Sequence, residues 1–68
     1  MRTIKILKDI TFNGILLKKH EEYTAKRYTP SGVGFFNKDG QEMYIYFDPD
    51  GKAHHDDGTV FAKIIGEK

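Results

Sequence analysis

Apolar and polar residues alternate along much of this chain, and the alternation is clearest between residues 42 and 48. Successive side chains of an extended strand point to opposite faces of a sheet. One face of this segment is therefore predicted to be core, with Met43, Ile45 and Phe47. The other face carries two tyrosines bordered by two carboxylates, namely Glu42, Tyr44, Tyr46 and Asp48. We expect this segment to be the central strand of the fold.

The first third of the chain has the pattern of a strand followed by a hairpin. Apolar residues occupy even positions in residues 3–12, and a break at Lys8-Asp9 predicts a bulge or bend. Asn13-Gly14 favours a two-residue type I′ turn, because both residues tolerate positive φ. Residues 15–17 should then return antiparallel, and the polar residues 18–22 should form a connection.

Glycine and proline divide the middle of the chain. Residues 23–28 alternate and predict a strand, which should end at residues 29–32, because proline fixes φ and glycine permits a sharp corner. A short strand is predicted over residues 33–36. Gly34 within it indicates a bend or a close backbone approach.

Two more turns divide the last third, at residues 49–51 and 56–58. They leave a brief strand at residues 52–55 and a final strand at residues 59–65. Alternation in the final strand assigns Val60, Ala62 and Ile64 to the core, in competition with Phe61 and Ile65.

These elements predict an all-β fold, since no stretch holds a helical period for more than about two turns. Five to six short strands joined by glycine-containing turns favour a small single-domain SH3-like barrel over residues 1–68, or else a rolled antiparallel sheet. An OB-like barrel is the next alternative.

Composition narrows the setting of the protein. A domain of 68 residues buries only about 60% of the surface that its unfolded chain exposes, yet 38% hydrophobic residues are enough for a compact core. The chain has no cysteine, which fits a reducing cytoplasm, and no apolar run that suits a signal peptide or a membrane span. We therefore expect a soluble cytoplasmic protein.

The net charge of +1 hides an asymmetry. Residues 1–28 contain seven Lys or Arg against three acids, a net charge of +4, and residues 29–68 contain four lysines against seven acids, a net charge of −3. Nucleic-acid binders usually carry a stronger basic excess than this.

The first third resembles a known family. Residues 4–14, followed by Leu17-Lys18-Lys19 and Glu22-Tyr23, resemble the opening of small SH3-like proteins of phages and prophages. His20 stands where that pattern often has glycine. The resemblance implies an accessory role in a mobile element, and it transfers no catalytic residues.

The segment around the two adjacent histidines contains suitable metal ligand types. Neighbours in an extended chain point apart, so only His54 with Asp56, or His55 with Asp57, would converge, and two ligands make a weak site. A calcium loop of the EF-hand type starting at Asp48 lacks the required ligands. No metal site or other cofactor is predicted.

Enzyme activity is not expected either. The chain has no cysteine, and Ser31 lies in a Pro-Ser-Gly turn without a nucleophile motif. A barrel of this size also has little room for a ligand pocket of about 300 Å³.

The function that these features favour is non-catalytic protein binding, because tyrosine is enriched among interface anchors. The hypothesis is an accessory protein that modulates or inhibits a larger host protein, as a monomer or weak homodimer and away from membranes. The predicted contacts are the tyrosine face and the acidic turns, that is Tyr44, Tyr46, Glu42, Asp48, Asp50, Asp56 and Asp57.

Single-stranded nucleic-acid binding is the alternative. Small barrels bind single strands by stacking bases on exposed aromatic rings along a basic groove, and Tyr44 and Tyr46 would supply such rings. Glu42 and Asp48 share their face and would repel phosphate, which ranks this function second.

Overall fold

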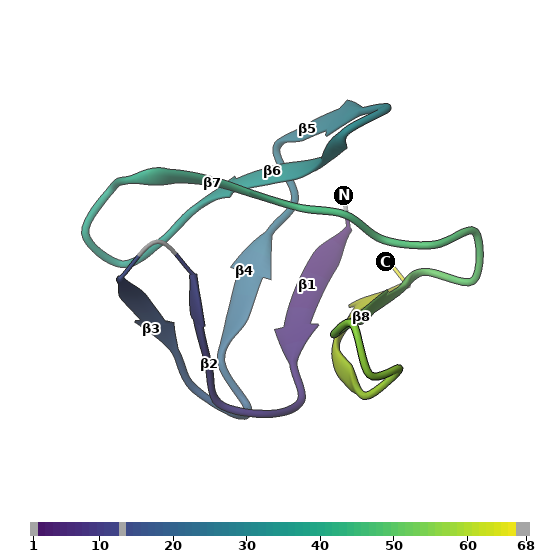
Figure 1. The fold of residues 1–68 in the computed structure, drawn as a ribbon. Helices are drawn as coiled ribbons and strands as arrows, with labels where there is room; N and C mark the ends of the chain where they lie inside the picture. Colours follow the sequence, from purple (N-terminus) through teal and green to yellow (C-terminus); the bar gives the residue numbers. More distant parts are fainter. Residues whose placement is uncertain (1, 13, 67–68) are drawn as a thin grey trace.

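The computed structural model describes residues 2–12 and 14–66, and every regular element in that part of the chain is a β-strand (Figure 1). The all-β class is thereby confirmed, with nine short strands in place of the five to six expected. The same residues contain no helix that is long and apolar enough to cross a membrane. In chain order the strands are β1 (Thr3–Ile6), β2 (Ile10–Phe12), β3 (Ile15–Leu17), β4 (Glu22–Thr24), β5 (Arg27–Thr29), β6 (Gly32–Phe36), β7 (Glu42–Ile45), β8 (Lys52–His54) and β9 (Val60–Ile65).

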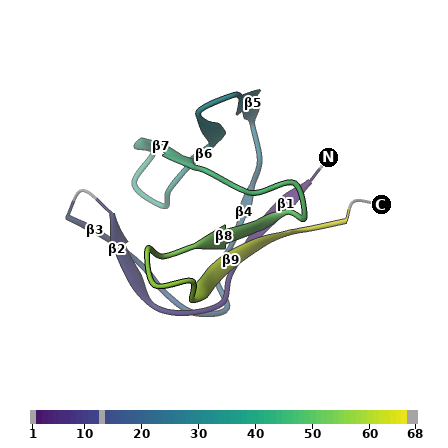
Figure 2. The same ribbon diagram turned by 45° about the vertical axis from the view of Figure 1, so that its right-hand side comes forward.

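The strands form three antiparallel sheets (Figure 2). The first sheet has the order β4-β1-β9-β8, the second has the order β5-β6-β7, and β2 pairs with β3 as a separate hairpin. Pairing among the described residues does not close these sheets into one barrel.

The extra strands arise where the chain passes from one sheet to another. Residues 23–28, predicted as one strand, divide between β4 and β5. The amide of Ala25 donates to the Arg2 carbonyl at 2.9 Å, beside the first sheet, and the next amide, of Lys26, donates to the Gly34 carbonyl of the second sheet at 2.8 Å. Consecutive amides thus bond to different sheets, and the strand breaks between them.

The predicted bend at Lys8-Asp9 is a complete break between β1 and β2. After β1 ends, the amides of Leu7 and Lys8 both donate to the Phe61 carbonyl, at 2.7 and 3.3 Å. The chain then leaves the first sheet, and β2 pairs with β3.

The hairpin predicted at Asn13-Gly14 is present, because β2 and β3 are antiparallel and Phe12 pairs with Ile15. Gly14 has a φ of 79°, the left-handed value that the prediction requires. Asn13 lies outside the described residues.

The core lies between the inner faces of the two larger sheets. Tyr23 of the first sheet packs on Phe35 of the second, with ring centroids 5.1 Å apart. Met43 and Ile45 are buried as predicted, and Phe47 is half-buried against the core. Each fully buried large apolar side chain contributes about 1.5–3 kcal/mol.

A β-bulge in β9 corrects the inward set predicted for the last strand. Ala53 pairs with Ala62, but His54 pairs with Val60, which leaves Phe61 as the additional residue. Both Phe61 and Ala62 are therefore buried, whereas Val60 is only half-buried.

Three lysines lie directly opposite one another on neighbouring strands of the first sheet. Lys5 of β1 pairs with Lys63 of β9, and Lys63 pairs with Lys52 of β8. They alternate with buried residues such as Ile4 and Ile6, so they share the outer face of the sheet. We refer to Lys5, Lys63 and Lys52 as the lysine row. Like charges in such positions destabilise a sheet.

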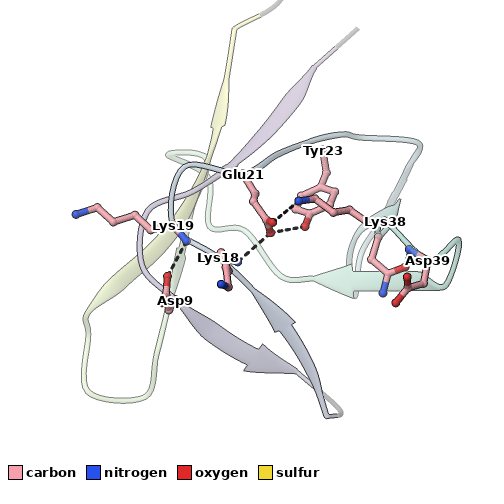
Figure 3. Close-up of polar contacts among 8 residues, drawn as sticks. Asp9, Lys18, Lys19, Glu21, Tyr23, Lys38 and Asp39 are labelled. Atoms are coloured by element: carbon pink, nitrogen blue, oxygen red, sulfur yellow. Dashed lines mark hydrogen bonds and ion pairs between the residues drawn. The ribbon is translucent and has the colours of Figure 1, made fainter.

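Glu21, just before β4, connects distant parts of the chain (Figure 3). One of its carboxylate oxygens accepts hydrogen bonds from the Lys18 amide at 2.9 Å and from the Tyr23 hydroxyl at 2.6 Å. The other lies 2.6 Å from the ammonium of Lys38 in the turn between β6 and β7. Lys38, followed by Tyr23 and the Lys18 amide, lowers the Glu21 pKa from 4.5 to about 2. Burial and the Glu21 hydrogen bond raise the pKa of Tyr23.

The tight turn between β3 and β4, which carries Glu21, is stabilised by a further contact. His20 adopts a φ of 78°, which is uncommon for a residue other than glycine. The neighbouring Lys19 amide donates to the Asp9 carboxylate at 2.7 Å (Figure 3). The connection therefore also ties to the break between β1 and β2.

Candidate functional site

A groove of about 470 Å³ runs beside the end of β7 and the tip of the β8–β9 hairpin. Tyr44 and Tyr46 line it from the β7 side, and His54, His55 and Asp56 line it from the hairpin side. Ser31 and Ile45 also line it, together with the rings of Phe12 and Phe61, which pack edge to face with centroids 5.5 Å apart. We refer to this hollow as the tyrosine groove.

Tyr44 is positioned by the glycine opposite it. Gly34 of β6 pairs with Tyr44 of β7, and a Cβ atom built on Gly34 would lie 2.9 Å from the Tyr44 Cε2 atom. The ring therefore lies across the backbone of β6 in space that any other residue would fill. The close approach predicted at Gly34 is present, but a side chain makes it rather than a backbone segment.

The hydroxyl of Tyr44 contacts one side chain from β5 and one from β7. It donates to the Glu42 carboxylate at 3.0 Å and accepts from the Arg27 guanidinium at 3.4 Å. These contacts hold the hydroxyl end of the ring, and the opposite end is attached to the backbone of β7. The ring nevertheless keeps 42% of its surface exposed.

β7 ends at Ile45, earlier than the predicted strand over residues 42–48. Beyond it, Asp48 makes a turn in which its carboxylate accepts from the amides of Asp50 at 2.9 Å and Lys52 at 3.0 Å. Tyr46, 63% exposed, precedes this turn. The alternation of exposed and buried side chains still holds as far as Phe47.

Asp48 and His54 form a hydrogen-bonded pair beside the groove. The Nε2 atom of His54 lies 2.7 Å from the Asp48 carboxylate, and its Nδ1 atom lies 3.3 Å from the Gly58 carbonyl. Both ring nitrogens face acceptors, an arrangement that suits the imidazolium form. The hydrogen bond to Asp48 raises the His54 pKa, and the Lys52 amide leads the contacts that lower the Asp48 pKa.

The structure engages the residues of the two metal pairs considered from the sequence in other contacts. His54 bonds to Asp48 rather than Asp56, and the Asp57 carboxylate accepts from the Thr59 amide at 2.9 Å. The ring of His55 packs on Phe61, with centroids 4.6 Å apart. Within residues 2–12 and 14–66, no three His, Asp or Glu side chains come together in a way that would hold a metal ion.

The seven residues predicted as partner contacts divide into three groups. Tyr44, Tyr46 and Asp56 line the groove itself. Glu42 and Asp48 border it through their hydrogen bonds to Tyr44 and His54. The remaining two lie elsewhere: Asp50 borders a second hollow, of about 270 Å³, with Arg2 and Ile64, and Asp57 supports its own turn.

The sequence pattern does not predict that Arg27, His54 and His55 lie at the same site as the two tyrosines. The pairing of Arg27, Gly34 and Tyr44 across three strands depends on register, which a single sequence does not reveal. One signal was present. A glycine in a strand, with an aromatic residue on a neighbouring strand, is a known combination in which the ring covers the glycine.

Charged groups of both signs border the groove. Asp56, Glu42 and Asp48 supply carboxylates there, and the guanidinium of Arg27 lies beside them at the Tyr44 hydroxyl. Lysine does not contribute to the lining among the described residues. The groove is therefore aromatic with carboxylates at its border, and the lysine row is not part of its described lining.

Comparison of the chain with known protein families, with curated proteins and with solved structures finds no match. The case for a function therefore rests on the residues of the groove and on their physical chemistry.

Proposed function

We propose that this protein is a non-catalytic protein-binding module whose contact surface is the tyrosine groove. The observation that carries the proposal is the pair of exposed rings, Tyr44 and Tyr46, at the border of a hollow with an aromatic floor. Such rings contribute large contact area with few rotatable bonds, which is why tyrosine recurs at interface hot spots. The mixed charges around them suit a polar rim.

The proposal extends to the SH3-like architecture and to the accessory role. One larger sheet contains β4-β1-β9 and the other contains β5-β6-β7, and one continuous segment supplies both β4 and β5. A strand that bends from one sheet into a second is a common way to wrap a small antiparallel fold around one core. Together with the phage-like opening of the sequence, this supports a module that binds and modulates a larger host protein.

The groove offers little for catalysis. Ser31 lines it together with His54, which invites comparison with a serine nucleophile and its base. Both ring nitrogens of His54 are engaged by Asp48 and by the Gly58 carbonyl, so neither is available to take a proton from a hydroxyl group. Binding without chemistry is the function that these contacts support.

Single-stranded nucleic acid fits the groove less well. Stacking on the tyrosines would bring phosphates close to Glu42 and Asp56, and none of the three lysines of the row lines the groove. A strand bound to the rings would therefore lack the basic track that such binding requires.

The proposal predicts that the double variant Tyr44→Ala/Tyr46→Ala loses its partner while keeping its fold. Both side chains are exposed, so their removal should change the free energy of unfolding by less than about 1 kcal/mol. Affinity capture from a native lysate, with and without nuclease, followed by mass spectrometry, would show a nuclease-resistant protein that the double variant no longer retains.

Tyr28→Ala is the matched control, because Tyr28 is 53% exposed but does not line the groove. This variant should retain the same protein as the unmodified chain. Equal capture by the double variant would contradict the proposal, and a partner that disappears with nuclease would favour the nucleic-acid alternative.

A further inference from the structure

We infer that Tyr44 and Glu42 together receive an arginine side chain of the partner, stacked on the open face of the tyrosine ring. The inference rests on the function proposed above and names the chemistry that the groove recognises. It follows from the placement of the ring, the charge around it and an arginine–tyrosine contact that the chain already makes elsewhere.

The ring of Tyr44 is prepared for stacking. Its inner face lies against Gly34, and its hydroxyl is held by Glu42 and Arg27, so the ring cannot turn freely. The residue as a whole keeps 42% of its surface exposed. A flat ring that is ordered before binding loses little conformational entropy when a planar group stacks on it.

A carboxylate oxygen beside the ring is left for a cation. Glu42 is exposed and uses one carboxylate oxygen, Oε2, for the Tyr44 hydroxyl, which leaves lone pairs on the other oxygen. Asp56 adds a second carboxylate to the lining of the groove. A guanidinium group stacks on an aromatic face and donates in its own plane to a carboxylate, whereas an ammonium is a compact, strongly hydrated charge. Arginine therefore fits better than lysine.

The chain already contains such a contact. The guanidinium carbon of Arg2 lies 5.7 Å from the centroid of the Tyr28 ring, within the range of a cation–π interaction. Arg27 does not occupy the equivalent place on Tyr44, because it meets the hydroxyl at the edge of the ring. The face of Tyr44 is thus left for an arginine from another molecule.

The test is an NMR titration of the isotopically labelled chain with two capped pentapeptides, Gly-Gly-Arg-Gly-Gly and the same peptide with citrulline. Citrulline has nearly the shape of arginine without its charge. The arginine peptide should shift the amide signals of Gly34 and residues 42–46, and it should bind about two- to fivefold more tightly than the citrulline peptide. Equal affinity, shifts centred elsewhere or an absence of shifts would overturn the inference.

Three variants separate the roles of the ring and of the charges. Tyr44→Leu should abolish the difference between the peptides, and Tyr44→Phe should keep most of it, because the aromatic face remains. Glu42→Gln should weaken arginine binding. Arg27→Gln should strengthen it, since a like charge is removed, and weaker binding by this variant would contradict the inference.

The inference and the proposed function fail in different ways. Lysate capture that depends on Tyr44 and Tyr46, combined with equal binding of the two peptides, would leave the protein-binding function intact and refute only the arginine site. Capture that is independent of both tyrosines would refute the function itself.

Discussion

Gly32 and Gly34 lie two residues apart in β6. The space that a side chain would fill is taken by a different neighbour at each of them. Gly32 has a φ of 152°, and a Cβ atom there would lie 2.9 Å from the Ile45 carbonyl oxygen, which belongs to the backbone. At Gly34 the neighbour is the ring of Tyr44, the end of a side chain that is 42% exposed and is held only by two exposed hydrogen bonds. The same substitution should therefore have unequal effects at the two sites.

We predict that Gly32→Ala lowers the free energy of unfolding by about 1–3 kcal/mol, because both the backbone and the contact are strained. Gly34→Ala should change it by less than about 1 kcal/mol, since alanine stiffens the strand while the ring shifts aside. Urea denaturation followed by circular dichroism measures both values. Equal losses for the two variants would show that the Tyr44 ring cannot yield.

Alternation alone predicts on which face of the strand each residue of the site lies. Tyr44 and Tyr46 are exposed as the period-two pattern indicates. Their partners could not be predicted in this way. The hydrogen-bonded pair of Asp48 and His54 joins residues on either side of a turn, and its formation depends on the path of the chain between them.

Among the connecting elements, the turn before β4 and the turn between β6 and β7 are held together by Glu21 and Lys38. The folded-state pKa of Glu21, about 2, is below its ordinary value of 4.5. A lowered carboxyl pKa stabilises the folded state fully above the ordinary value, and this contribution disappears as the pH falls through the folded value. Glu21 thus contributes stability above pH 4.5 that is lost as the pH falls toward 2.

Glu21→Gln should lower the free energy of unfolding at pH 7 by about 1 kcal/mol, a value reduced by solvent screening of the exposed Lys38 ammonium. Below pH 4.5 the difference between the variant and the unmodified chain should narrow. Thermal melts from pH 2 to pH 7 measure this trend. A constant difference across the series would contradict the lowered pKa.

The hairpins were the elements that the sequence predicted best. Asparagine, glycine and aspartate mark the turns at residues 37–40 and 56–58, and the paired strands stand on either side of them. The long strands were predicted less well, since alternation continues across Ala25 and Lys26 although these amides bond to different sheets. Local pattern records which side of the chain is apolar, whereas a change of sheet is decided by tertiary contacts.

For the whole molecule, the class of fold followed from the sequence, and the layout of charge over its surface did not. The excess of Lys and Arg in residues 1–28 favoured charges scattered over the surface, with a basic side made from that part of the chain as the alternative. The lysine row instead combines Lys5 from β1 with Lys63 and Lys52 from the acidic part. Strand order, which brings β1 beside β9, places these charges together.

We predict that Lys63→Glu stabilises the protein by roughly 0.5–1.5 kcal/mol, because it converts two like-charge neighbours into two attractive pairs. Lys26→Glu, at an exposed position outside the row, is the control and should change stability by less than about 0.5 kcal/mol. Chemical denaturation at low salt measures both effects. Destabilisation by Lys63→Glu would mean that the repulsion within the row is already relieved in the folded protein.

The lysine row also has a kinetic consequence for the encounter with a partner. It places three ammonium groups on the outer face of the first sheet, with Glu22 opposite Lys5 at one end, while carboxylates border the tyrosine groove. A basic partner that approaches by diffusion would be repelled from the lysines and drawn towards the groove, so that more collisions begin in a productive orientation. At physiological ionic strength this guidance acts over about 8 Å, and the row then influences how fast a complex forms without touching the partner.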